Sequence, residues 1–127
     1  MSYLVDTNIF LEILLEQEKK EICKDFLESN IGEIFISDFS LHSIGVILFK
    51  YNKVKLFSTF LEDTLDKIEI LTLSKEKYEE IVDISDQYKL DFDDSYQFLL
   101  SQENEITLAT QDNDFQIVDK VISVLFL

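Results

Sequence analysis

The chain has 127 residues, and its 26 acidic against 11 basic side chains give a formal net charge of −15 at pH 7. All the basic residues are Lys, so the bidentate guanidinium clamp for phosphate is missing, and the charge excludes unaided electrostatic binding to a nucleic acid backbone. The 46% apolar content, with 11 Phe and 5 Tyr, excludes a disordered chain and suffices for the core of one domain over residues 1–127.

Short apolar runs alternate with helical spacing along the first half of the chain. The run 3–5 predicts a strand, and it ends at Asp6-Thr7-Asn8, whose side chains favour the start of a helix. A second strand is predicted over 33–36, followed by helices over 39–51 and 54–65. Before that strand, a helix is predicted whose apolar face carries Ile22, Cys23, Phe26 and Leu27.

The second half of the chain continues the alternation. A third strand is predicted over 68–73, and Asp91-Phe92-Asp93-Asp94 is predicted to open a helix that runs through about Glu103. The fourth and fifth strands are predicted over 106–110 and 121–127. This alternation predicts an α/β fold with a mostly parallel sheet covered on both faces. Between these elements, Ser74 is predicted to start a helix with one face made of Tyr78, Ile81, Val82, Ser85 and Tyr88.

The N-terminus and the single cysteine indicate a cytoplasmic protein without a membrane segment. Residues 1–6 lack a basic stretch followed by an apolar one, and no apolar run approaches the roughly 18 residues of a spanning helix. Cys23 has no second cysteine to pair with, which agrees with a reducing compartment. We expect Cys23 to be a packed thiol.

Acidic residues lie where predicted strands end, the place where parallel sheets bind ligands. Asp6 follows the first strand, Asp112 and Asp114 follow the fourth, and Asp94 stands beside Asp93 at a helix start. Helix capping would explain any one of them alone. Two like charges about 4 Å apart cost roughly 4 kcal/mol at an effective dielectric of 20, so a cluster requires a cation or raised pKa values. Carboxylate ligands favour Mg²⁺ or Mn²⁺ over zinc.

Four segments of the chain form a pattern that is more specific than any one of them. They are Leu4-Val5-Asp6-Thr7-Asn8, Ser37-Asp38-Phe39-Ser40, Asp93-Asp94-Ser95 and Ala109-Thr110-Gln111-Asp112-Asn113-Asp114-Phe115. In this order, along nearly the whole chain, they resemble PIN domains, the metal-dependent ribonuclease domains that include the toxins of bacterial VapBC toxin–antitoxin pairs. The resemblance implies a single three-layer α/β domain with a five-stranded sheet in the order 3-2-1-4-5. In that order the ends of strands one and four are neighbours.

The resemblance also implies a role for each acid. Asp6, Asp94 and Asp112 correspond to the catalytic, metal-binding acids, and Asp114 to an auxiliary metal ligand, while Asp93 is the neighbour that could exchange roles with Asp94. The family's remaining acid, a Glu in the helix after the second strand, falls at Ser43. The implied activity is hydrolysis of RNA phosphodiester bonds with Mg²⁺ or Mn²⁺. The implied partners are an antitoxin protein and a second copy of the chain in a homodimer.

Two alternatives to the ribonuclease stay open at this stage. Ser43 favours a PIN fold that has lost catalysis and acts as a protein-interaction module, whereas the retained acids favour the enzyme. The acids alone would equally suit a metal-dependent phosphohydrolase acting on small phosphate esters. The predicted helix 39–51 is apolar on all sides, which requires either a central position or a protein interface. Its apolar residues outside the Ile44 and Leu48 face are Val46, Ile47, Phe49 and Tyr51.

Overall fold

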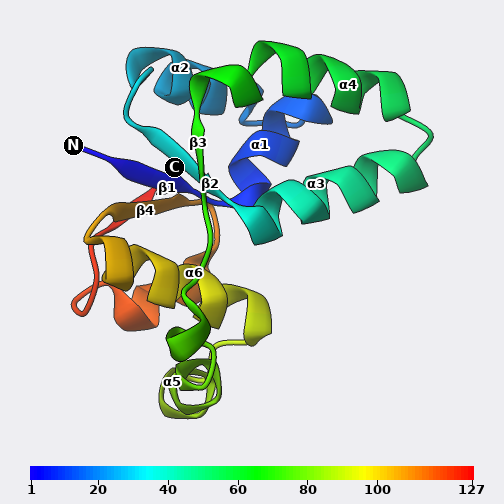
Figure 1. Ribbon diagram of the computed structural model, residues 1–127. Helices are drawn as coiled ribbons and strands as arrows, with labels where there is room; N and C mark the ends of the chain where they lie inside the picture. Colours follow the sequence, from blue (N-terminus) through cyan, green and yellow to red (C-terminus); the bar gives the residue numbers. More distant parts are fainter.

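The computed structural model describes residues 1–127 and confirms the alternation of strands and helices (Figure 1). The strands are β1 Tyr3–Val5, β2 Ile34–Ser37, β3 Glu69–Leu71, β4 Thr107–Thr110 and β5 Val124–Phe126. The α-helices are α1 Thr7–Leu14, α2 Lys20–Ser29, α3 Asp38–Lys50, α4 Val54–Asp63, α5 Glu80–Tyr88 and α6 Phe92–Asn104. The short 3-10 helices are η1 Leu65–Lys67, η2 Lys75–Lys77 and η3 Asn113–Val118.

All five strands form one parallel sheet in the order β3-β2-β1-β4-β5, which confirms the predicted order. The central strand β1 pairs with β2 on one side and with β4 on the other, so that Leu4 lies opposite both Phe35 and Leu108. The chain builds the sheet outward from β1 to β3, and then returns to add β4 and β5 on the other side. The carboxyl ends of β1 and β4 are therefore adjacent where the strand order reverses.

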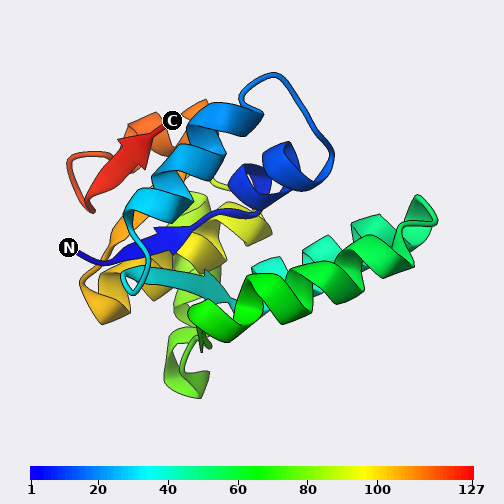
Figure 2. The same ribbon diagram turned by 90° about the horizontal axis from the view of Figure 1, so that it is seen from above.

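Successive residues of the strands face opposite layers of helices, because side chains alternate along a strand. Leu4 and Leu108 pack in the core beneath α5, α6 and η3, whereas Val5 and Ala109 pack in the core that includes α1 to α4. Figures 1 and 2 show these two groups of helices on opposite faces of the sheet, with the α3–α4 hairpin projecting beyond it. None of the helices combines the length and the hydropathy that crossing a bilayer requires.

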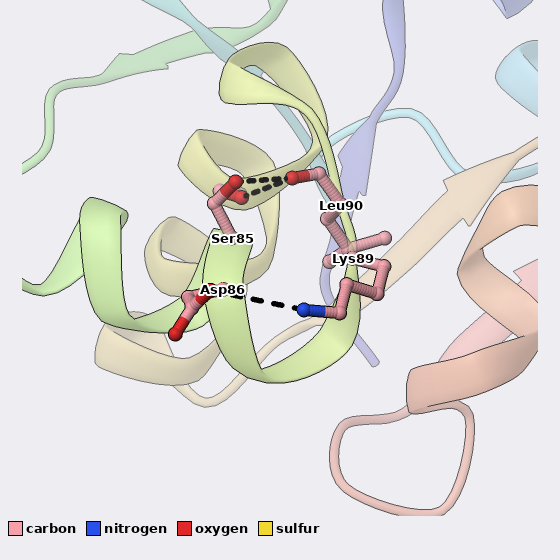
Figure 3. A network of polar contacts seen from close by, with 5 residues as sticks. Ser85, Asp86, Lys89 and Leu90 are labelled. Atoms are coloured by element: carbon pink, nitrogen blue, oxygen red, sulfur yellow. Dashed lines mark hydrogen bonds and ion pairs between the residues drawn. The ribbon is translucent and has the colours of Figure 1, made fainter.

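The connection between α5 and α6 is a tight turn held by two serines (Figure 3). Lys89 adopts a left-handed conformation with φ of 58°, which ends α5, and the next residue, Leu90, is buried. The carbonyl of Leu90 accepts hydrogen bonds from the hydroxyls of Ser85 at 2.6 Å and Ser95 at 3.4 Å. Lys89 also forms an exposed ion pair with Asp86, a kind of contact that contributes little stability. The turn thereby fixes where α6 starts.

Three residues predicted on apolar helix faces are instead exposed to solvent. Ile22 is 54% exposed, Tyr78 is 45% exposed and Val82 is 71% exposed. The predicted helix from Ser74 is in fact interrupted, since η2 precedes α5 and α5 begins only at Glu80. Each residue of a helix turns by about 100°, so the buried stripe of a short helix is narrow and excludes positions at its border. Cys23 is fully buried, as predicted.

Candidate metal centre at the ends of β1 and β4

Three of the predicted acids meet at the reversal of strand order. One carboxylate oxygen from each of Asp94, Asp112 and Asp114 lies within 4.8 Å of the other two. Asp112 follows β4, and its Oδ1 accepts a hydrogen bond from the backbone N–H of Asp114 at 2.9 Å. Asp94 lies in the first turn of α6, where its N–H donates to Asp91 Oδ1 at 2.9 Å. Helix capping and acid clustering therefore occur together, and the capping contacts fix the acids in place.

Asp6 is not one of the three clustered acids, and four donors hold its carboxylate. Its Oδ1 accepts hydrogen bonds from the N–H of Thr7 at 2.9 Å and from Gln97 Nε2 at 3.1 Å. Its Oδ2 accepts from Thr110 Oγ1 at 2.7 Å and from Asn8 Nδ2 at 3.4 Å. The residue is only 7% exposed. The structure thus places Asp6 as a fixed, buried carboxylate beside the three clustered acids.

The electrostatics of the cluster favour a bound proton or cation. The pKa of Asp94 is raised to about 8, mainly by burial and then by repulsion from the neighbouring carboxylates of Asp91, Asp112, Asp6 and Asp114. Burial also raises the pKa of Asp6, although the hydrogen bonds from Thr110 and Gln97 act in the opposite direction. A site that raises acid pKa values in this way would be relieved by a positive charge at its centre.

The chemistry of the donor set fits a hard divalent cation. The clustered ligand atoms are all carboxylate oxygens, which suit Mg²⁺ or Mn²⁺, and neither Cys23 nor His42 belongs to the cluster. A buried amide oxygen, Gln97 Oε1, has no hydrogen-bond partner, so this polar network is not saturated. The residues present are therefore compatible with the metal that the family resemblance implies.

Ser43 does not join the four acids. It is partly buried on α3, and its hydroxyl makes no hydrogen bond to them. One turn earlier, Ser40 enters the network, because its Oγ accepts from Gln97 Nε2 and from Thr7 Oγ1, both at 2.8 Å. Gln97 was not among the residues predicted from the sequence to belong to the site. The available signal was one amide within the apolar run Tyr96 to Leu100, three residues after Asp94.

Comparison with known proteins identifies the family. The PIN domain model matches residues 3–121. The chain belongs to the PIN domain family. This membership confirms the resemblance seen in the four sequence segments, and the strand order agrees with it. No curated protein sequence matches the chain.

Several solved structures share this PIN fold. VapBC2 from Rickettsia felis, bound to a DNA fragment from its promoter, aligns with a TM-score of 0.81 and 18% identity, over 99% of this chain and 98% of that chain. A toxin–antitoxin complex from Klebsiella pneumoniae aligns with a TM-score of 0.76 and 22% identity, over 98% and 96%. VapC20 of Mycobacterium tuberculosis, described as a sarcin-ricin loop cleaving toxin, aligns with a TM-score of 0.73 and 15% identity, over 91% and 93%.

Proposed function

We propose that this PIN domain is a metal-dependent endoribonuclease of the toxin type, which hydrolyses RNA phosphodiester bonds with Mg²⁺ or Mn²⁺. The observation that carries the proposal is the cluster of Asp94, Asp112 and Asp114 where the strand order reverses, with Asp6 fixed beside it. The similarity to VapC20, described as a sarcin-ricin loop cleaving toxin, supports RNA as the substrate class.

Each acid has a distinct part in this proposal. Asp94, Asp112 and Asp114 would hold the cation, and Asp6 would complete the site from the end of β1. A bound cation supplies an activated water and stabilises charge on the attacked phosphoryl group. Because the pKa of Asp94 is raised to about 8, its carboxyl carries a proton at neutral pH in the metal-free protein. Asp94 would have to lose that proton to bind a cation, so the proposal predicts that metal affinity rises with pH.

The same proposal includes protein partners, namely an antitoxin and a second copy of the chain. Val46 and Phe49 are exposed on α3, and together with Phe57 and Ile70 they line an open groove of about 700 Å³. Apolar side chains gathered at one surface are typical of a protein interface. Similar folds occur in toxin–antitoxin complexes, which supports an antitoxin as one of the partners.

The test of the proposed activity is cleavage of single-stranded RNA across a Mn²⁺ titration. We expect weak, metal-dependent cleavage by the wild type, and none by Asp6→Asn or Asp94→Asn. Because Ser43 lacks the charge of the family's Glu, Ser43→Glu should lower the Mn²⁺ concentration required, provided that the longer side chain fits. A small phosphate ester assayed in parallel separates a ribonuclease from a general phosphohydrolase.

A second candidate function, a protein-interaction module without catalysis, is favoured by Ser43 itself. If the wild type and Ser43→Glu both match the background of Asp6→Asn at every Mn²⁺ concentration, the ribonuclease proposal is wrong. The interaction module would then be the better description of the protein.

A further inference from the structure

Gln97 is a buried polar residue in an otherwise apolar part of α6. It is 1% exposed, and its sequence neighbours Tyr96 and Phe98 belong to the hydrophobic core. It follows Asp94 by three positions, so both side chains emerge on the same side of the helix. Neither the family resemblance nor the proposed metal ligands assign a part to Gln97.

The amide of Gln97 joins three elements at the candidate centre. Its Nε2 donates to Asp6 Oδ1 at 3.1 Å and to Ser40 Oγ at 2.8 Å. Asp6 stands between β1 and α1, and Ser40 belongs to the first turn of α3. Thr7 Oγ1 also donates to Ser40 Oγ at 2.8 Å, which closes a ring of contacts between α1, α3 and α6.

The orientation of this amide leaves one atom without a partner. The two neighbours of Nε2 act as acceptors, so turning the amide over would set Oε1 against the Asp6 carboxylate, and the two oxygens would repel each other. In the orientation that satisfies Asp6, Oε1 is buried and has no hydrogen bond. Buried unpaired carbonyl oxygens are uncommon because they lose hydration without replacement. A Met side chain would fill a similar volume without that loss, so packing alone does not account for Gln97.

Asp6 needs such a contact because it stands near other negative charges. Burial and, to a smaller extent, repulsion from Asp112 raise the pKa of Asp6, and repulsion from Asp6 adds to the effect of burial on the pKa of Asp94. Of the four donors to the Asp6 carboxylate, Gln97 is the one that comes from α6, the helix that carries Asp94. Gln97 supplies a neutral donor from the opposite layer of helices, and it therefore adds no charge that would compete with a cation.

We propose that Gln97 is a positioning residue that holds Asp6 at the acid cluster, on the side of the site where the family's Glu is replaced by Ser43. The amide supplies a restraint on Asp6 but no additional charged ligand. This inference rests on the proposed function, because the position of Asp6 matters only when the acids bind a cation.

The experiment measures Mn²⁺ binding directly, from the loss of the electron paramagnetic resonance signal of the free ion. Gln97→Met removes both N–H donors and keeps the length of the side chain. We expect a dissociation constant for Mn²⁺ roughly tenfold higher than that of the wild type, since loss of a contact that orients a metal ligand typically lowers affinity 10- to 100-fold. The matched control is Gln102→Met, an exposed residue of the same helix, which should bind Mn²⁺ as the wild type does.

A double-mutant cycle tests whether Gln97 acts through Asp6. In the Asp6→Asn background, Gln97→Met should change the Mn²⁺ dissociation constant less than twofold, because the carboxylate that it positions is already gone. If Gln97→Met raises the Mn²⁺ dissociation constant by the same factor in the wild-type and the Asp6→Asn backgrounds, the inference is wrong. If Gln97 had only a structural role, Gln97→Met would lower the melting temperature of the metal-free protein and leave the dissociation constant for Mn²⁺ unchanged.

The remaining outcomes separate this inference from the proposed function. If the wild type binds Mn²⁺ and cleaves RNA, and Gln97→Met binds Mn²⁺ equally well, the inference about Gln97 is wrong and the proposed function stands. If the wild type does not bind Mn²⁺, both fail. Should Gln97→Met not fold, Ser40→Ala removes the second acceptor of the amide. That variant should raise the dissociation constant in the wild-type background only, and an unchanged value would overturn the inference.

Discussion

At the residue scale, identical side chains acquire different properties from their surroundings. Asp6 and Asp94 are both buried carboxylates, but four donors surround Asp6, whereas Asp94 faces several other acids. Hydrogen bonds to a carboxylate favour its ionised form, and nearby negative charge favours its protonated form. Burial raises the pKa of both acids, but the hydrogen bonds act against this at Asp6, whereas the neighbouring carboxylates raise the pKa of Asp94 further, to about 8.

The raised pKa of Asp94 predicts how stability depends on pH in the presence of a chelator. The pKa of an Asp in an unfolded chain is about 3.9, whereas the pKa of Asp94 in the folded protein is raised to about 8. Between these values the folded state binds more protons than the unfolded state, so the free energy of unfolding falls as pH rises. We expect the melting temperature to decrease from pH 5 to pH 8. In Asp94→Asn this decrease should be smaller, and an identical slope in both proteins would contradict the assignment.

Asp112→Asn separates repulsion from capping at the cluster. The amide oxygen of Asn can still accept the hydrogen bond from the N–H of Asp114, so the local cap is retained. Removal of one repelling charge should raise the melting temperature of the metal-free protein by a few degrees, which corresponds to about 1 kcal/mol.

Thermal unfolding with Mn²⁺ completes this comparison. At a metal concentration of about 100 times the dissociation constant, the wild type should gain roughly 2.7 kcal/mol, and Asp112→Asn should gain much less. Should Asp112→Asn be less stable than the wild type in chelator, Asp112 would be a structural cap instead of a metal ligand.

At the scale of elements, the α3–α4 hairpin combines a core face with an uncovered apolar face. Ile44 and Leu48 of α3 are fully buried against the sheet layer, as their spacing predicted. Gly45 allows α4 to approach closely, since an added Cβ would lie 3.3 Å from Cζ of Phe57. Phe49 packs edge to face on Phe57 and remains 55% exposed. One helix thus supplies both the core and the surface proposed for association.

Phe49→Glu tests the proposed interface without disturbing the core. Because the side chain is exposed in the single chain, the substitution should preserve the circular dichroism spectrum while converting a dimer, or a complex with an antitoxin, to the monomer. Light scattering coupled to size exclusion measures the change. Ile44→Ala is the matched contrast on the same helix, and it should lose about 2–5 kcal/mol of stability because it empties a core position. If Phe49→Glu unfolds, Phe49 belongs to the core and not to an interface. If the wild type is monomeric in the absence of a partner, the proposed homodimer is wrong.

At the scale of the whole molecule, the net charge of −15 acts against the compact state. Only four ion pairs occur, and one of them involves the N-terminal amine. Self-repulsion among the acids therefore outweighs pairing across the surface. The same charge would repel RNA, so the proposed function requires a cation at the acid cluster or a basic partner to attract the phosphate backbone.

Added salt should therefore stabilise the metal-free protein. The Debye length falls from about 30 Å at 0.01 M to about 10 Å at 0.1 M salt, which screens repulsion between separated acids. We expect the melting temperature in chelator to rise with KCl over this range. The melting temperature of Asp112→Asn should rise by nearly as much, because KCl screens repulsion among acids over the whole chain. A melting temperature that falls with KCl would mean that attractive ion pairs dominate.

The alternation of strands and helices, the fold family and the candidate acids were predictable from the amino-acid sequence. These features are local, because a capping Asp or an apolar run is recognisable from adjacent residues, and the four matching segments lie in order along the chain. The borders of amphipathic stripes were less predictable. Val82 fits an apolar face in sequence, but it is rotated by about 100° around α5 from the buried Ile81 and is exposed.

Which of these acids come together, and which donors hold them, became visible in the tertiary structure. In that structure Asp94, Asp112 and Asp114 form a cluster, whereas Asp6 is held by hydrogen-bond donors of its own. The fold also brings Gln97 to Asp6 across 91 positions of sequence. A lone amide in an apolar helix has no local signal for the group that it faces. That group is set by the packing of α6 against β1 and α3, which depends on contacts along the entire chain.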